Sequence, residues 1–469
     1  MAPSPAPHLL GPLFTSDAMA AVFSDAARLQ AMLDFEAALA KAEASIGLIP
    51  STAADAIAGA CRADRFDIAT LARATAEAGN PAIPMVKQLT ALVAERDPDA
   101  AGFVHWGATS QDAIDTGLVL QIRAGLASME PDLRRLSDAL AALAQTHAKT
   151  VMMGRTLMQQ AVPVTFGLKA AGWLAAIARA HTRLTDAGKA AQVLQFGGAA
   201  GTLAALGDRG LDVAAALAKE LDLGLPELPW HGHRDRLVDL AAALGLLAGT
   251  LGKMARDIAL LMQTEVAEAF EPAGEGRGGS STMPHKRNPI ACAVALAAAA
   301  RIPPLVATLL AAMPQEQERG LGGWHAEWET LPQIFLLAAG ALHHMSDTVA
   351  GLTVDAERMH ANIDATRGLV MAEAVAMALA DRIGKQEAHK LVESACRRAV
   401  AEAAHLRDAL ARDPAVMAQL NAETLDRLFA PESYLGMAER FVERALAARR
   451  RGQIGITLSN FRLHGTPHG

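Results

Sequence analysis

The chain has 469 residues, 51% of them hydrophobic, and a formal net charge of −7 at pH 7. Its length, about three times the roughly 150 residues typical of one domain, predicts two or three domains with a large core. Only 4% of the residues are aromatic, so the apolar residues are mainly Ala, Leu, Val and Met, a composition that favours helices over strands. The charges are well mixed and leave no basic stripe, which excludes nucleic-acid binding as the main role.

Targeting features are weak throughout. The N-terminal segment has prolines where a signal peptide needs a charged region, and its apolar stretch is too short. The most apolar segments, residues 237–252 and 291–300, are interrupted by Asp239 or stopped by Arg301 before the roughly 20 residues of a membrane span. Three widely spaced cysteines match no metal or redox motif and are typical of a reducing compartment. We therefore expect a soluble, cytoplasmic protein without a membrane partner.

Helical periodicity dominates the chain from its first elements onward. Leu29, Met32, Leu33 and Leu39 recur at helical spacing, and the first hundred residues contain several such helices separated by Gly and Pro. The helices that follow are far longer than the average of about 11 to 12 residues. After residue 367 the helices shorten and charges rise. The expected long helices span residues 114–149, 163–188, 234–270, 289–313 and 331–359.

This order predicts an all-α protein of three helical domains: residues 1–112, 113–366 (the long-helix bundle) and 367–469. Several central helices are rich in Ala on more than one face, with few polar residues to solvate the outside of a monomer. Burial on all sides favours packing against neighbouring subunits, and a very large monomer core is the alternative. We expect a homo-oligomer.

The first of three loops that precede long helices is HWGATSQD at residues 105–112. Thr109 and Asp112 have the spacing of a capping box, and apolar residues at helical spacing follow. Free amides and short hydroxyls at a helix N-terminus favour an anion site. The alternative is an ordinary cap with His105 and Trp106 packed beneath it.

The second loop is MGRTLMQQAVP at residues 153–163, where Pro163 is placed for the first turn of the next helix. Arg155 and Thr156 are suited to bind a carboxylate. Arg155 equally fits a structural ion pair.

The third loop, EGRGGSSTMPHKRNP at residues 275–289, joins a glycine-rich stretch to Asn288 and Pro289, an expected N-cap and first-turn proline. The Walker ending is absent, which disfavours a nucleotide site. Ser280 and Ser281 lie among glycine amides ahead of Lys286, and amides together with a cation are what a serine needs to act as a base. A flexible linker with solvated charges is the alternative.

The three loops resemble the signature regions of a known superfamily. GSSTMPHKRNP at residues 279–289 resembles the signature loop of the fumarase/aspartase superfamily, which includes fumarase, aspartase, argininosuccinate lyase and adenylosuccinate lyase. The first two loops resemble its first two signature regions, in the same order. Within the superfamily, QQA at 159–161 and QEQERGLGGW at 315–324 are most similar to the bacterial 3-carboxy-cis,cis-muconate cycloisomerase family.

The resemblance implies a homotetramer of three-domain helical subunits around a twenty-helix core, with each active site built from three subunits. The sequence has no metal or nucleotide motif, and the paired histidines at 231 and 233 and at 343 and 344 lack a convincing ligand spacing, so we expect no cofactor and no metal. Ser280 matches the proton-transferring serine and is, with Lys286, the catalytic candidate. Lys286 and Asn288 match groups that hold the substrate carboxylate. The remaining substrate-binding candidates are His105, Thr109, Ser110, Arg155, Thr156, Gln159, Ser281, Met283, Arg287 and Arg319.

One departure bears on the reaction. Where fumarase and adenylosuccinate lyase have His after the Arg-Thr pair, this chain has Leu157. Hydroxide and amines are poor leaving groups that need a proton, whereas opening a lactone releases a carboxylate with a pKa near 4. The resemblance and Leu157 together predict lactonisation of 3-carboxy-cis,cis-muconate, a small tricarboxylate, in protocatechuate catabolism. The alternatives are another lyase acting on a sulfonated muconate or substituted succinate, an adenylosuccinate-lyase-like enzyme, and a catalytically silent structural homologue.

Overall fold

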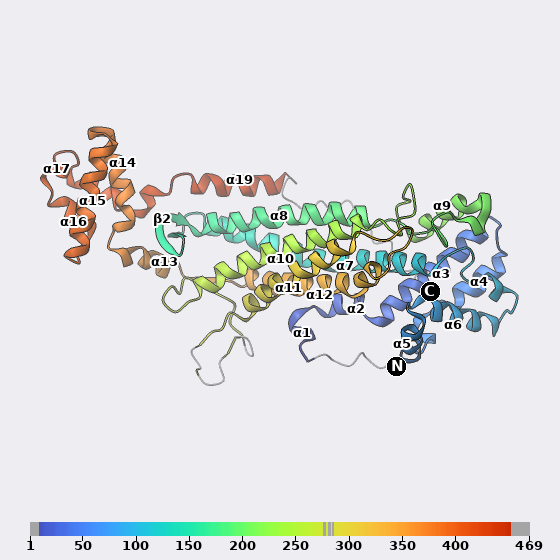
Figure 1. The fold of residues 1–469 in the computed structure, drawn as a ribbon. Helices are drawn as coiled ribbons and strands as arrows, with labels where there is room; N and C mark the ends of the chain where they lie inside the picture. The colour runs from blue at the N-terminus through green and yellow to red at the C-terminus, as the bar shows by residue number, and fades with distance from the viewer. Residues whose placement is uncertain (1–8, 275–277, 280–282, 284–285, 452–469) are drawn as a thin grey trace. The chain divides into compact units, whose positions relative to one another are not determined.

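The computed structural model describes residues 9–274, 278–279, 283 and 286–451 (Figure 1). Most of the regular structure is α-helical, which confirms the predicted all-α class. The strands in the described part form two small antiparallel pairs. One joins β1 (Val151–Thr156) to β2 (Gln159–Thr165), and the other joins β3 (Ala269–Phe270) to β4 (Thr353–Val354).

The chain divides into two compact units. Unit 1 contains residues 1–133, 180–252 and 294–344, and unit 2 contains residues 134–179, 253–293 and 345–469. The long helices contribute residues to both units, so the units do not follow the predicted boundaries at 112 and 366. The three-domain division stays a prediction.

The N-terminal part of unit 1 packs around α3, as its periodicity predicts. Leu33, Phe35 and Leu39 of this helix are fully buried, and α3 contacts α4 and α9. Ser16 and Ser24 cap α2 and α3 by accepting a hydrogen bond from the amide three residues on. The helices are α1 (Gly11–Phe14), α2 (Asp17–Val22), α3 (Asp25–Ser45), α4 (Ser51–Ala60), α5 (Ile68–Ala78), α6 (Ala82–Ala94) and α9 (Gly210–Leu221).

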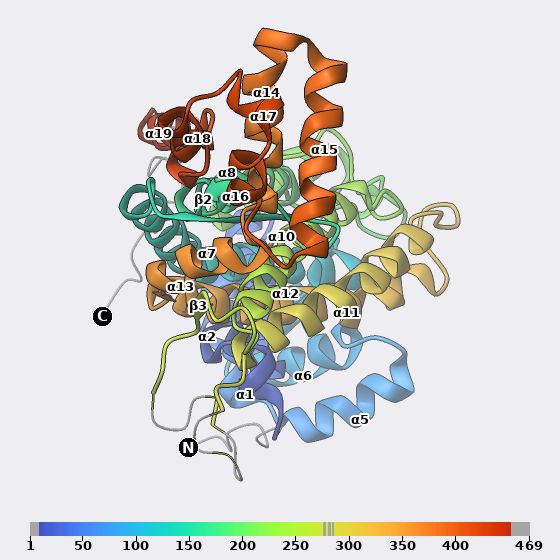
Figure 2. The same ribbon diagram turned by 90° about the vertical axis from the view of Figure 1, so that its left-hand side faces the viewer.

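Five long helices follow, as expected: α7 (Ser110–Thr146), α8 (Phe166–Ala191), α10 (Asp235–Leu261), α11 (Ile290–Ala312) and α12 (Gly323–Ala350). Within unit 1, parts of these helices lie side by side (Figures 1 and 2). Glycine permits two of the close approaches. A Cβ at Gly252 of α10 would lie 2.6 Å from the Cβ of Ala299 of α11, and one at Gly188 of α8 would lie 2.6 Å from Leu126 of α7.

Three predicted helix boundaries were wrong. Pro163 lies in β2 rather than in the first turn of a helix, because the preceding residues pair as a hairpin. The helix expected to reach residue 270 ends at Leu261. The last two residues of the expected range, Ala269 and Phe270, form β3 instead. The helix expected over 331–359 begins earlier and ends at Ala350, before Gly351 and a strand that pairs with β3.

The C-terminal helices of unit 2 are short, as predicted. Those between residues 372 and 428 enclose an apolar core, which includes Val375, Leu379, Leu406, Leu410 and Leu425. Their bounds are α13 (Ala356–Ile363), α14 (Ala372–Ile383), α15 (Lys385–Ala401), α16 (Leu406–Ala411), α17 (Pro414–Met417), α18 (Ala422–Leu428) and α19 (Ala438–Arg450).

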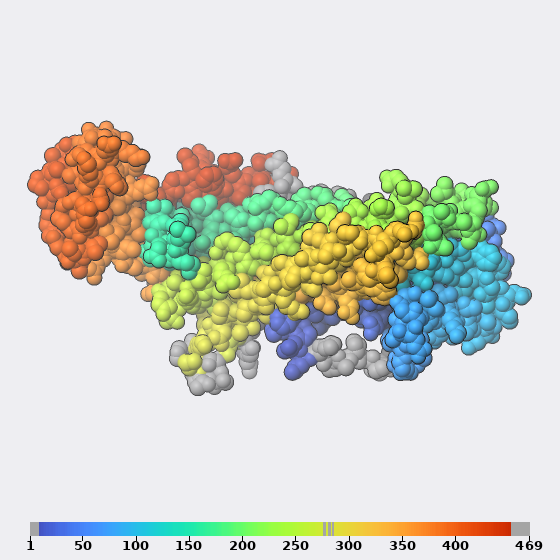
Figure 3. Space-filling model, viewed as in Figure 1, coloured from blue at the N-terminus to red at the C-terminus, as the bar shows by residue number. Residues whose placement is uncertain are grey.

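The helices α10 and α11 are both long and apolar enough to cross a membrane by length and composition alone. Each helix runs through its charged residue, Asp239 in α10 and Arg301 in α11, as the helices expected over residues 234–270 and 289–313 do. In the most apolar stretch of α10, 61% of the residues are buried, whereas in α11 only 28% are. Figure 3 shows α11 as yellow atoms at the surface. The described chain therefore leaves a long apolar helix largely uncovered.

Candidate functional site

The first signature region forms the start of α7. The Asp112 carboxylate accepts a hydrogen bond from the Thr109 amide at 3.0 Å, which is one half of the predicted capping box. It also accepts from the amides of Gly197 and Gly198 at 3.0 and 2.9 Å and lies 2.9 Å from His231 Nε2. The buried Asp112 carboxylate therefore holds the start of α7 against the segments around Gly197 and His231, and it is not a ligand for substrate.

The Thr109 hydroxyl faces Arg319, a residue far away in sequence. Arg319 Nη2 donates to Thr109 Oγ1 at 3.2 Å and to the Ala199 carbonyl at 3.1 Å, while Arg319 Nε donates to Gln111 Oε1 at 3.0 Å. Arg319 is exposed, and Thr109 and Ser110 are partly exposed. The fold therefore brings a guanidinium and two hydroxyls of the predicted set to one accessible spot at a helix N-terminus.

His105 is held by a buried acid. Its Nδ1 lies 2.6 Å from Glu36 Oε1, and its side chain is 16% exposed. Burial lowers the pKa of His105, but the Glu36 carboxylate outweighs burial, so the pKa is raised overall. Burial, together with the charge of Glu36, raises the pKa of Glu43 to about 8, so Glu43 is protonated at neutral pH. The Asp112 carboxylate acts in the same direction as Glu36 and also raises the pKa of His105. Trp106, which would pack beneath the helix start if the loop were an ordinary cap, is 42% exposed.

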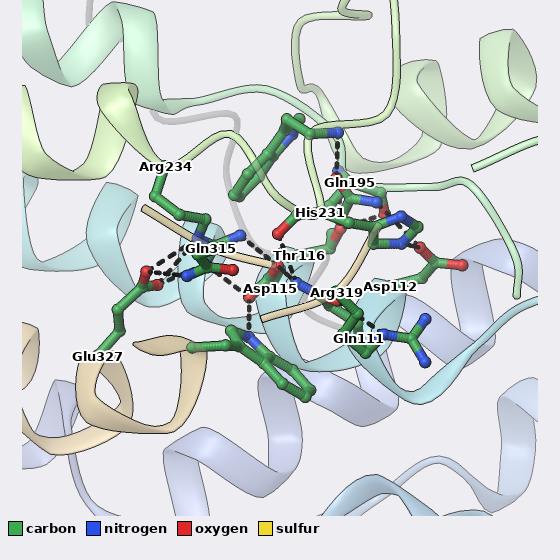
Figure 4. A network of polar contacts seen from close by, with 12 residues as sticks. Gln111, Asp112, Asp115, Thr116, Gln195, His231, Arg234, Gln315, Arg319 and Glu327 are labelled. Atoms are coloured by element: carbon green, nitrogen blue, oxygen red, sulfur yellow. Dashed lines mark hydrogen bonds and ion pairs between the residues drawn. The ribbon is translucent and has the colours of Figure 1, made fainter. Parts of the chain in front are cut away.

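Behind this spot lies a buried ion network that the sequence analysis missed (Figure 4). Arg234 is fully buried and makes bidentate contacts with both Asp115 and Glu327, at distances of 2.6 to 3.0 Å. Trp324 Nε1 donates to Asp115 at 3.0 Å, and the Arg234 guanidinium lies 4.8 Å from the centre of the Trp230 ring. The sequence does carry a signal for this network, because Asp115 interrupts the apolar face of a helix.

The second signature region is a tight hairpin rather than an open loop. Thr156 pairs with Gln159, so Leu157 and Met158 form the two-residue turn. Both turn residues have left-handed backbones, with φ of 49° and 66°, and their exposed fractions are 96% and 71%. Asn and Gly are the residues that favour such turns, so the hairpin presents two apolar side chains at the cost of strain.

Arg155 makes the ion pair that the sequence left open. Its Nη1 and Nη2 donate to the Glu268 carboxylate at 2.8 and 2.6 Å, and Asn362 Nδ2 donates to the same carboxylate at 2.7 Å. Glu268 is fully buried. Arg155 therefore anchors the hairpin next to β3, and direct binding of substrate by Arg155 stays a prediction.

Part of the third signature region lies outside the described residues, including Ser280 and Ser281. The described ends of this loop meet, because the Asn288 amide donates to the Gly278 carbonyl at 2.8 Å. Glycine is needed at position 278 because its φ of 64° is in the left-handed region. A Cβ there would also lie only 2.7 Å from the backbone carbonyl oxygen of Asn288. Met283 and Lys286 are exposed.

The N-terminus of α11 is capped by Glu271 and not, as expected, by the side chain of Asn288. The Glu271 carboxylate accepts from the amides of Ala291 and Cys292 at 3.2 and 2.8 Å. Arg287 Nη2 donates to the Glu271 carbonyl at 2.6 Å, and its guanidinium lies 4.9 Å from the centre of the Phe270 ring. Two of the first amides of α11 thus already bind a carboxylate of the protein.

The site residues are divided between the units. The first signature region and Arg319 belong to unit 1, and the second and third regions belong to unit 2. Among the described residues, no group of three or more His, Cys, Asp or Glu side chains is placed to hold a metal ion. His231 and His343 contact Asp112 and Asp132 instead, as expected for structural histidines.

Comparison with known proteins places the chain in a family. Residues 14–303 match the family model described as Lyase, and residues 368–445 match the model described as Adenylosuccinate lyase C-terminus. The chain belongs to this lyase family, which confirms the resemblance to the fumarase/aspartase superfamily.

Individual relatives cover nearly the whole chain. The 3-carboxy-cis,cis-muconate cycloisomerase of Pseudomonas aeruginosa is 58% identical over 95% of this chain and 97% of its own. The protein of the same name from Bradyrhizobium diazoefficiens is 56% identical over 94% of this chain and 98% of its own. The crystal structure of the 3-carboxy-cis,cis-muconate lactonizing enzyme from Pseudomonas putida matches with a TM-score of 0.91 and 54% identity, over 95% of this chain and 99% of that chain.

Proposed function

We propose that the protein is a cofactor-independent cycloisomerase that converts 3-carboxy-cis,cis-muconate into the carboxymuconolactone in protocatechuate catabolism. The observation that carries this proposal is the 58% identity, over 95% of the chain, to a cycloisomerase of that name. The hairpin tip supports it, because Leu157 stands where lyases with poor leaving groups have His. The enzyme is proposed to be soluble and cytoplasmic.

The proposed reaction needs one proton. A carboxylate of the substrate attacks its own conjugated double bond, and negative charge develops on the neighbouring carbon and its carboxylate. Ser280 gives a proton to that carbon and takes it back in the reverse direction. Lys286 and Asn288 stabilise the enediolate-like intermediate. The expelled group in lactone opening is a carboxylate, which leaves without a second acid.

The substrate's carboxylates set the remaining roles. Thr109 and Ser110 of the first region, and Thr156 of the second region, bind substrate carboxylates through hydroxyls and nearby amides. Arg319 binds a second or third carboxylate, because the fold holds it beside Thr109 and leaves it exposed. His105, which Glu36 favours as an imidazolium, adds positive charge near the same helix start. The other proposed substrate contacts are Arg155, Gln159, Ser281, Met283 and Arg287.

The deciding assay follows the loss of the conjugated-diene absorbance of 3-carboxymuconate. We expect turnover of this substrate and none of adenylosuccinate or argininosuccinate, and activity that survives exhaustive chelation. If the protein turned over only another lyase substrate, its function would be that of a related lyase and not of a cycloisomerase. A folded protein inactive on all three would favour the silent homologue.

The active enzyme is proposed to be a homotetramer with a twenty-helix core. Two features support an assembly: α11 is apolar yet mostly uncovered, and the site residues Thr156, Met283 and Lys286 are exposed in the single chain. Neighbouring subunits would bury α11 and complete a site around the three exposed residues.

A mixing experiment tests the shared site. Subunits inactivated by Ser280→Ala and subunits inactivated by Thr156→Ala should regain activity when unfolded and refolded together, because some sites of a mixed tetramer carry neither lesion. The readout is turnover per hybrid tetramer, identified by native mass spectrometry. Hybrids that form without regaining activity would contradict the shared site, and each variant refolded alone is the control.

Leu157→His tests the role of the leaving group. We expect the cycloisomerase kcat to stay the same or fall, because lactonisation needs no acid at this position. The fold should tolerate the change, since Leu157 is 96% exposed and His adopts left-handed backbones more readily than Leu. The measurement is kcat per folded tetramer for wild type, Leu157→His and the polar control Leu157→Gln. A large gain specific to the His variant would show that the reaction uses an acid there.

A further inference from the structure

We propose that Gln111 is a positioning residue that fixes the Arg319 guanidinium beside Thr109 and thereby sets the preference of the site for a ligand with a third carboxylate. This inference rests on the proposed role of Arg319 in carboxylate binding. Gln111 itself is fully buried, so it acts through Arg319 and not by touching the substrate.

The contacts of Gln111 allow one orientation of its amide. Nε2 donates to Asp115 Oδ2 and to the His231 carbonyl, both at 3.0 Å, so both amide hydrogens are used. Oε1 is left to accept from Arg319 Nε at 3.0 Å. A flipped amide would turn its oxygen toward a carboxylate and a carbonyl and its hydrogens toward a guanidinium. The contacts therefore determine that the oxygen faces Arg319.

The anchor behind this amide is rigid because it is buried and fully bonded. Asp115 accepts from Arg234 at 2.7 and 3.0 Å and from Trp324 Nε1 at 3.0 Å. Arg234 is held in turn by Glu327. Two carboxylates therefore hold one guanidinium in place, and Gln111 Nε2 is bonded to one of them, Asp115.

Arg319 needs this support because it is exposed. An exposed arginine has many rotamers, and ordering one reduces the cost of binding a ligand. The bonds to Gln111, Thr109 and Ala199 use Nε and Nη2, while Nη1 has no partner among the described residues. Figure 4 shows Arg319 at the margin of the network, joined to it through Gln111. The geometry thus leaves the hydrogens of Nη1 to bind a carboxylate.

The test measures binding rather than turnover, so that it does not depend on the reaction. Propane-1,2,3-tricarboxylate and glutarate share a five-carbon chain with two terminal carboxylates and differ only in the central carboxylate. Isothermal titration calorimetry on the full-length assembled protein gives the ratio of their Kd values. Gln111→Met keeps the side-chain length and removes both hydrogen-bonding functions. The matched control is Gln121→Met, since Gln121 is also buried on α7 and its Nε2 donates to the Val22 carbonyl at 2.8 Å, away from Arg319.

Wild type should prefer the tricarboxylate, and Gln111→Met should reduce that preference about tenfold, the size of one hydrogen bond to a charged group. Arg319→Met should abolish the preference, and the double variant should match Arg319→Met alone. Gln121→Met should keep the wild-type ratio even if it lowers Tm. If Gln111→Met fails to fold, Gln111→Asn carries the same expectation, because its shorter amide cannot reach all three partners.

The outcomes distinguish the positioning role of Gln111 from the carboxylate-binding role of Arg319. A wild-type ratio in Gln111→Met beside a lost preference in Arg319→Met would overturn the role of Gln111 and leave that of Arg319 intact. A wild-type ratio in Arg319→Met, or a wild type that binds neither compound, would contradict the carboxylate site itself and the inference with it. A loss in Gln121→Met equal to that in Gln111→Met would show a general effect of destabilisation and would also overturn the inference.

Discussion

Ser280→Ala is expected to lower kcat for 3-carboxymuconate by about 10²- to 10⁴-fold, the usual contribution of a positioned proton donor. The proposed reaction has one proton transfer, to carbon, and Leu157 offers no second acid. KM and Tm should change little, because alanine keeps the backbone of the loop and removes only the hydroxyl. The measurement is kcat and KM from the loss of diene absorbance, normalised to folded tetramer.

The neighbouring serine provides the matched control. Ser281→Ala should raise KM more than it lowers kcat, since Ser281 is a proposed binding residue. Nearly wild-type turnover in folded Ser280→Ala would contradict the assignment. Lys286 would then be the proton donor to test, through Lys286→Met.

Arg234→Met is expected to destabilise unit 1 by about 3–5 kcal/mol, the usual cost of removing one partner from a buried ion pair. The variant leaves Asp115 and Glu327 buried without a counter-charge, and they are 1% and 2% exposed. The readouts are Tm by calorimetry and the urea midpoint. Arg407→Met is the control, because Arg407 pairs with Asp426 at 2.7 Å at the surface and should contribute about 0–1 kcal/mol.

Adding Glu327→Gln to Arg234→Met should recover part of the loss, because one uncompensated charge is removed. Equal losses in Arg234→Met and Arg407→Met would mean that water reaches the network and that its charges are solvated. In that case the rigid anchor inferred for Gln111 would also lose its support.

The sequence by itself determined the class of fold, the long helices and the three loops that matter. Helical spacing is a local property: Leu29, Met32 and Leu33 fall on one face wherever that helix packs. The loop motifs are also local, so they could be read without a structure. The sequence likewise showed Leu157 after the Arg-Thr pair, and that residue bears on the proposed reaction.

Only the tertiary structure decided which of these residues meet. Arg234 is 119 residues from Asp115 and 93 residues from Glu327 along the chain, and nothing local says that two acids and a base will share one buried site. The ion pair of Arg155 with Glu268 and the cap that Glu271 places on α11 depend in the same way on contacts across the fold. The hairpin at 151–165 was missed because its turn is Leu-Met, without the Asn or Gly that marks such turns. Charge pairing depends on distance in space, and a sequence gives only distance along the chain.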